Sequence, residues 1–247
     1  MKTKFYILLM MVLAVFACDD SGGPTANTLT GRGGSLARFA VTETHLYAVE
    51  DATMKVYQFM DDGALEKINE VDLGSGAETI YATGQRVFIG KNDGMVAFDI
   101  TNPANPVYYT SYAHFVSCDP VVVQDTMAYV TLRSSGCRPS GANQLDVVNI
   151  KDPMHVSVVG SYALTEPYGL GIDGGLLFVC EGDHGLTLLD VSEPLNAKII
   201  KHYPDYHAYD VIPNHGTLIL TGNDGVAQYD YTDKNAMKKL SLIPVAK

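Results

Sequence analysis

The sequence predicts an all-β fold built from five repeats of four short strands, and three observations support it. A pair of apolar residues recurs in steps of 41, 41, 49 and 41 residues, as Leu46-Tyr47, Val87-Phe88, Ala128-Tyr129, Leu177-Phe178 and Leu218-Ile219. Around each pair, short apolar runs alternate with Gly- or Asp-bearing turns. No helical periodicity of useful length occurs beyond the N-terminal segment. Four-stranded repeats of this length predict a five-bladed β-propeller, because no repeat can bury its apolar face alone.

The repeats are expected at about 36–76, 77–117, 118–166, 167–207 and 208–247. The expected strands, taken repeat by repeat, are Leu36–Val41, His45–Val49, Met54–Phe59 and Leu65–Leu73; Glu78–Thr83, Arg86–Gly90, Met95–Ile100 and Val107–Tyr112; Pro120–Val123, Met127–Leu132, Gln144–Ile150 and Val156–Tyr162; Tyr168–Ile172, Leu176–Cys180, Leu186–Val191 and Ala197–Tyr203; Tyr209–Ile212, Thr217–Thr221, Val226–Tyr231 and Met237–Ile243. The eight extra residues of the third repeat fall within 133–143. The ring is expected to close by packing of blade on blade, or by an edge strand from 28–32.

A recurring Asp or Asn follows the third strand of the inner repeats and is followed four residues later by Pro, as in Asp99 to Pro103 and Asp190 to Pro194. These carboxylates could be taken for a chemical motif. Asp and Asn bond their own backbone in turns, and Pro presets φ there. Recurrence in successive repeats therefore favours a structural role.

The segments 94–103 (GMVAFDITNP) and 185–194 (GLTLLDVSEP) resemble the repeat of the LVIVD-repeat proteins. The first and fifth repeats depart from this pattern, as terminal repeats often do. The resemblance implies a propeller-like fold on an exported or surface protein. It supplies no catalytic residues.

The N-terminus reads as an export signal. Lys2 and Lys4 precede an apolar stretch, 5–17, that is too short to span a bilayer comfortably. Cys18 follows at once, so residues 1–17 resemble a bacterial lipoprotein signal, with Cys18 as the lipidated residue. The alternative is an ordinary secretory signal with a free Cys18. Residues 18–34 are expected to be a flexible tether, and 35–247 the propeller.

The net charge of the chain disfavours some classes of binding partner. The net charge of −11 becomes −13 when two lysines leave with the signal. This negative charge argues against nucleic acid as a partner and against electrostatic binding to anionic lipid. The protein is therefore expected in the bacterial cell envelope, with the outer membrane favoured, held by its lipid anchor alone and monomeric.

One face of the propeller is the candidate binding surface, because it carries the connections between blades and the turns between second and third strands. The candidate residues on it are Glu78, Asp119, Tyr168, Tyr209, His207 and His114. Three hypotheses compete: a recognition module for a protein, peptide or glycan; a metal site built from Glu78, Asp119 and His207; and a hydrolase with a carboxylate or His base near the central channel. No hydrolase, zinc-protease or phosphate-loop motif is present. The sequence thus favours a non-enzymatic binding or scaffold protein, with no catalytic residue, metal or cofactor assigned.

Three cysteines remain beyond Cys18. Cys118 and Cys137 are expected on the same face, so a disulfide between them is plausible in an exported protein; the alternative is two free thiols. Closing a loop of about 20 residues would stabilise by roughly 3 kcal/mol in the chain-entropy model. Cys180 lies in an apolar strand and is expected to be a small buried residue.

Overall fold

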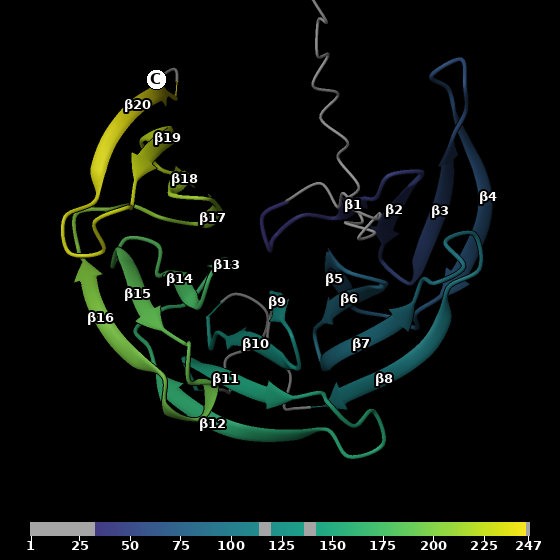
Figure 1. Ribbon diagram of the computed structural model, residues 1–247, viewed down its shortest axis with the longest axis horizontal. Coiled ribbons are helices and arrows are strands. Elements are labelled where there is room, and N and C mark those ends of the chain that lie inside the picture. Colours follow the sequence, from purple (N-terminus) through teal and green to yellow (C-terminus); the bar gives the residue numbers. More distant parts are fainter. Residues whose placement is uncertain (1–32, 114–119, 136–141, 246–247) are drawn as a thin grey trace, which may run out of the picture.

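The computed structural model describes residues 33–113, 120–135 and 142–245, and these form a five-bladed β-propeller (Figure 1). Each blade is an antiparallel sheet of four strands that pair in chain order. The strands of the five blades are β1 (Phe39–Val41), β2 (His45–Glu50), β3 (Thr53–Phe59) and β4 (Leu65–Asp72); β5 (Ala77–Thr83), β6 (Arg86–Lys91), β7 (Gly94–Asp99) and β8 (Val107–Ala113); β9 (Val121–Gln124), β10 (Met127–Leu132), β11 (Gln144–Asn149) and β12 (Ser157–Ala163); β13 (Leu170–Asp173), β14 (Leu176–Cys180), β15 (Leu186–Asp190) and β16 (Lys198–Tyr203); β17 (Asp210–Asn214), β18 (Thr217–Gly222), β19 (Gly225–Asp230) and β20 (Lys238–Pro244).

The observed strands confirm the predicted all-β fold and its four-stranded repeats. The largest difference is at β1, which begins at Phe39 rather than Leu36 because the preceding residues form a turn, closed by the Ala37 N–H on the Gly34 carbonyl at 3.0 Å. A single 3₁₀ turn, η1 (Pro194–Asn196), connects β15 to β16. Among the described residues, no helix combines the length and apolar character required to cross a membrane.

The predicted turn motif is confirmed as structural. Asp99, Asn149, Asp190 and Asp230 each accept a hydrogen bond from the backbone N–H two residues later, at 2.8–3.0 Å. These side chains therefore close the connection from the third strand to the fourth.

The core consists of four apolar clusters, one at each interface between blades adjacent in sequence. Blades 2 to 4 are covered on both faces, and β14 is buried along its whole length. In blades 1 and 5, by contrast, buried residues alternate with half-buried or exposed ones along β2 and β19. No apolar cluster of described residues joins blade 5 to blade 1, and Figure 1 shows the ring open there. Direct packing of the first blade on the last, one of the two expected modes of closure, is therefore not what the described residues show. The other mode, an edge strand from 28–32, falls outside them.

The residues just before β1 link distant blades instead (purple in Figure 1). We call Gly33 to Arg38 the N-terminal clip. The Ser35 hydroxyl accepts a hydrogen bond from the Leu170 N–H at 2.7 Å and donates to the Asp210 carboxyl at 3.4 Å. The Ala37 carbonyl accepts a hydrogen bond from the Ile80 N–H at 2.9 Å. The clip thus ties blade 2 to blades 4 and 5. Gly34, expected at the end of the tether, is buried and belongs to the fold.

Candidate functional site

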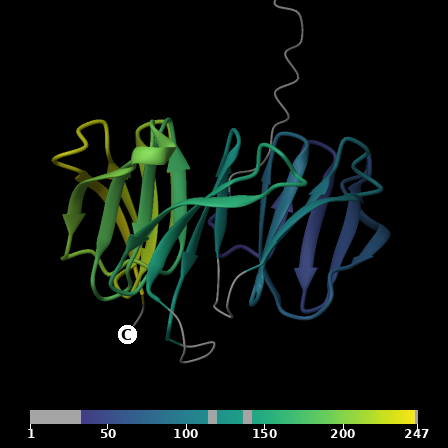
Figure 2. The ribbon, with the colours of Figure 1, turned by 90° about the horizontal axis from the view of Figure 1, so that it is seen from below.

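The disc has two faces, seen edge-on in Figure 2. The interblade face carries the connections between blades and the turns from second to third strands. The turn face carries the turns from first to second and from third to fourth strands. The sequence places its candidate residues on the interblade face.

Two of the predicted residues come together there. The rings of Tyr168, just before β13, and Tyr209, just before β17, meet edge to face with centroids 5.0 Å apart. The Arg133 guanidinium lies over the Tyr168 ring, 3.9 Å from its centroid. Tyr168 is half-buried, and burial is the main reason that its pKa is raised, so its hydroxyl keeps its proton at neutral pH.

Glu166 connects this aromatic pair to its neighbours. Its carboxylate accepts hydrogen bonds from the Ser135 hydroxyl at 2.7 Å and the Tyr168 hydroxyl at 3.3 Å. His184 Nε2 lies 3.7 Å from the other carboxylate oxygen. We call Arg133, Ser135, Glu166, Tyr168, His184 and Tyr209 the tyrosine cluster. It combines aromatic area with both signs of charge, which suits recognition of a polar partner.

The other predicted residues lie apart from this cluster or outside the described chain. The Glu78 carbonyl accepts a hydrogen bond at 3.2 Å from Nε of Arg38, the last residue of the clip. His207 Nδ1 lies 3.5 Å from the Asp224 carboxylate. His114, Cys118, Asp119, Cys137 and Cys18 are outside the described residues, as is most of the inserted loop. Within the described residues, no three His, Cys, Asp or Glu side chains are grouped to hold a metal. The metal site that includes Asp119 therefore stays a prediction, and so does the Cys118–Cys137 disulfide.

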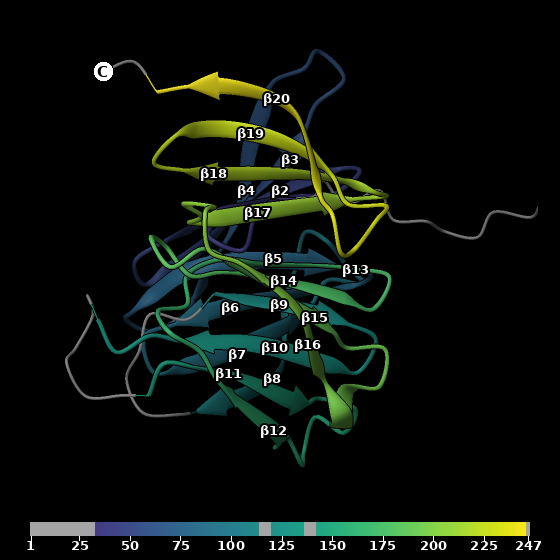
Figure 3. The same ribbon diagram turned by 90° about the vertical axis from the view of Figure 1, so that its left-hand side faces the viewer.

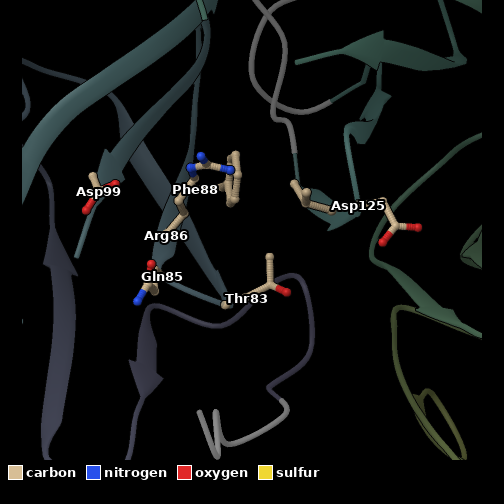
Figure 4. Close-up of a pocket in the computed structure, with 8 residues that line it drawn as sticks. Thr83, Gln85, Arg86, Phe88, Asp99 and Asp125 are labelled. Carbon is tan, nitrogen blue, oxygen red and sulfur yellow. The ribbon is translucent and has the colours of Figure 1, made fainter. Parts of the chain in front are cut away.

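The turn face carries a pocket that the sequence did not predict. It lies between blades 2 and 3 and has a volume of about 310 Å³. Figure 4 shows Arg86 and Thr83 from blade 2 across this space from Asp125 of blade 3. The Arg86 guanidinium lies over the Tyr109 ring at 4.0 Å, and its buried Nε has no hydrogen-bond partner among the described residues. A hydrogen bond from Thr101 is the main cause that lowers the Asp99 pKa, with Arg86 a weaker one.

The pocket was not predictable from loop length, which favours the interblade face as the binding surface. A local signal does exist. Asp125 has φ of 55°, the left-handed region that Asp tolerates in turns. The Gln124-Asp125-Thr126 turn could therefore have been marked as unusual, but not as one wall of a pocket.

Cys180 is fully buried, and its thiol is free. Burial is the main reason that its pKa is raised well above the usual value. The expectation of a small buried residue rather than a nucleophile agrees with this environment.

The chain is similar to known proteins in its repeat sequence and in its fold. The LVIVD repeat model matches residues 75–114 and 169–204, which contain the second and fourth blades. The fold is similar to a functionally unknown protein from Desulfotomaculum acetoxidans DSM 771 (TM-score 0.65, 9% identity, 83% of this chain and 67% of that one). It is also similar to the periplasmic gluconolactonase of Pseudomonas aeruginosa (TM-score 0.61, 12% identity, 82% and 68%) and to a structure of the nidogen/laminin complex (TM-score 0.59, 15% identity, 82% and 76%).

No curated protein has significant sequence similarity to the chain. At these identities, the solved structures bear on the fold alone. Together, the family match and the sheet topology identify the chain as a five-bladed β-propeller that contains LVIVD repeats.

Proposed function

We propose that the protein is a non-enzymatic binding protein that holds a protein or peptide partner on its interblade face. The observation that carries this is the tyrosine cluster, in which Tyr168 is fixed between Arg133 and Tyr209. Tyr and Arg are the residues enriched where a few side chains dominate binding energy. The two tyrosine rings and the Arg133 guanidinium already contact one another, so little ordering entropy is lost when a partner docks.

The hydrogen bonds within the cluster support binding rather than proton transfer. One Glu166 oxygen accepts from both Ser135 and Tyr168, which fixes the orientation of the carboxylate. The acidic chain also favours partners with a basic surface over anionic ones.

The binding test starts from a broad peptide, protein and glycan array probed with the full chain. Tyr168→Ala should weaken saturable binding at least tenfold, since it removes an aromatic side chain from the centre of the contact, worth about 2 kcal/mol or more. Tyr168→Phe keeps the ring and should retain most of the affinity. Tyr108→Ala is the matched control, because Tyr108 is an exposed tyrosine on the outer strand β8. Unchanged binding by Tyr168→Ala would contradict the proposal, and glycan-only binding would replace the peptide partner.

The non-enzymatic part has its own test. The likeness to a gluconolactonase is one of fold, at 12% identity. The protein should therefore show no turnover of gluconolactone above the uncatalysed rate. Turnover lost on a single substitution of Glu166 or His184 would overturn this part of the proposal.

We further propose that the mature protein is a monomer, anchored through a lipidated Cys18 in the bacterial envelope, with the outer membrane favoured. The support is the sequence of the signal and the cysteine that follows it. Two or more acyl chains hold a protein stably on a membrane, at about 0.8 kcal/mol per buried CH₂. Metabolic labelling with an alkyne fatty acid should mark the wild type and not Cys18→Ser, and the variant should leave the membrane fraction. Labelling of Cys18→Ser would contradict the anchor.

A further inference from the structure

A second pocket lies at the rim of the interblade face, where the connection from blade 3 meets blade 4. Its volume is about 350 Å³, and we call it the rim pocket. The residues that line it and matter here are Leu164, Thr165, Glu181, Thr187, Ile199 and His202. None of them was a candidate in the sequence, because they come from a loop, a turn and two strands that only the blade brings together.

A chain of hydrogen bonds runs through its wall. Glu181, with a nearly fully buried side chain, accepts the Thr165 N–H at 2.6 Å and the Thr187 hydroxyl. The oxygen of that same hydroxyl lies 2.8 Å from His202 Nδ1. The Thr187 hydroxyl thus lies between a carboxylate oxygen and an imidazole nitrogen, and only one of them can take its proton.

The direction of these hydrogen bonds determines which ring nitrogen of His202 carries the proton. A carboxylate can only accept hydrogen bonds, and a hydroxyl has one proton to donate. Thr187 gives its proton to Glu181, so its oxygen must accept from His202, and Nδ1 must carry the hydrogen. In the neutral ring Nε2 is then a bare acceptor. The His202 side chain is 42% exposed, so a ligand can reach it from solvent.

The charges around the pocket are one-sided. Glu181 Oε1 lies 3.8 Å from His202 Nδ1, and the lining residues include no Lys or Arg. Leu164 and Ile199 add aliphatic surface beside the polar wall. A bare nitrogen acceptor, a buried negative charge and aliphatic surface together suit a cation that can donate a hydrogen bond, and disfavour an anion.

We propose that the rim pocket binds a primary ammonium group, which donates a hydrogen bond to His202 Nε2 while its alkyl chain lies along Leu164 and Ile199. The ammonium group could belong to a small amine or to a lysine side chain. This site does not depend on the tyrosine cluster, so each can fail without the other.

The test uses the full chain labelled with ¹⁵N-histidine. A long-range ¹H–¹⁵N spectrum at neutral pH should show His202 with its proton on Nδ1. Titration with n-butylammonium should shift His202 Nε2 saturably. Tetramethylammonium, which has the charge but no N–H donor, should bind at least tenfold more weakly. N-acetyl-lysine amide distinguishes the sources: tighter binding than n-butylammonium favours a lysine side chain, and weaker binding favours a small amine.

His155 is an internal control. Its Nδ1 lies 2.7 Å from the Asp152 carboxylate, so its ring is also oriented by an acid, but its side chain is 82% exposed and it does not line the rim pocket. It should show no saturable shift. Thr187→Val should abolish the His202 response and Thr187→Ser should restore it. An Nε2–H tautomer, equal binding of tetramethylammonium, or a His155 response that matches that of His202 would each overturn the proposal.

Discussion

At Asp210, burial and hydrogen bonding shift the carboxyl pKa in opposite directions. Its carboxyl accepts hydrogen bonds from the backbone of Ser35, Leu36 and Val211, which lower its pKa, yet burial outweighs them and raises the pKa to about 6. Gly34 and Gly169 lie so close that a Cβ on either would stand 1.9 Å or 2.3 Å from a carboxylate oxygen. The space around Asp210 is therefore shaped by two glycines far apart in sequence.

This environment predicts a pH-dependent stability. Because the folded-state pKa is raised from 3.8 to about 6, the neutral acid is favoured in the folded protein. The contribution of Asp210 to the free energy of unfolding, about 3 kcal/mol, is complete below about pH 4 and is lost as the pH rises through 6. Asp210→Asn has no such titration. Urea unfolding of both proteins at pH 4.5 and pH 7.5 should show the wild type losing about 2 kcal/mol of stability relative to Asp210→Asn, since the rest is already lost by pH 4.5.

Asp230→Asn serves as the control for that measurement. Hydrogen bonds from Thr232 lower the Asp230 pKa, so its contribution is present above its unfolded pKa and lost as the pH falls. Both pH values lie above that range, so its difference from the wild type should stay nearly constant between them. A constant difference between wild type and Asp210→Asn would show that Asp210 does not titrate in this range.

At the scale of single residues, the sequence could predict what the repeat itself positions. Tyr168 and Tyr209 occupy equivalent places before β13 and β17, so their approach followed from the repeat. Asp210 and Glu181 could not be found in that way. The Ser35–Asp210 contact joins residues 175 positions apart, and the Glu181 environment depends on Thr165 and Thr187 arriving from different segments.

At the scale of elements, strand boundaries were predictable because turn chemistry is local. The Asn92-Asp93-Gly94 signal places the end of β6 and the start of β7 within about a residue. The start of β1 was not predictable, because the clip before it is held by blades 2, 4 and 5 rather than by its own sequence.

The clip predicts a stability effect out of proportion to its length. Ser35→Ala removes the acceptor of the buried Leu170 N–H, so unfolding free energy should fall by about 1–3 kcal/mol. Gly34→Ala should cost more, since its Cβ would collide with Asp210. Chemical denaturation of each variant measures this. Ser111→Ala is the matched control, an exposed serine whose hydroxyl bonds Tyr108 and whose loss should change stability by about 0.5 kcal/mol or less.

An unchanged denaturation midpoint in Ser35→Ala would mean that the clip does not hold the blades in solution.

The predicted disulfide can be tested on the same preparations by peptide mapping without reductant. That mapping should recover Cys118 linked to Cys137 and Cys180 free, and three free thiols would remove the predicted disulfide.

At the scale of the whole molecule, the five blades form an arc with two ends. Strands β17–β20 form one end, with β20 outermost (Figure 3), and every residue of β20 is exposed. Leu240 and Ile243 are 52% and 71% exposed there, whereas the central strand β14 is buried throughout. The number and order of blades followed from the 41-residue period. The unequal cover of the end blades did not, because a repeat pattern carries no information on how its first and last copies meet.

The arc predicts a gradient of local stability that hydrogen exchange can measure. The second strands β2, β6, β10, β14 and β18 are the fair comparison, since each is hydrogen-bonded to a strand on both sides. Amides of β6, β10 and β14 should exchange at least tenfold more slowly than those of β2 and β18, because only the inner blades are covered on both faces, and tenfold corresponds to about 1.4 kcal/mol of opening free energy. The buried Cys180 thiol, at the end of β14, should be labelled no faster than the β14 amides exchange. Equal protection in all five strands would mean that blades 1 and 5 cover each other in solution, and the linking role assigned to Ser35 and Asp210 would then be unnecessary.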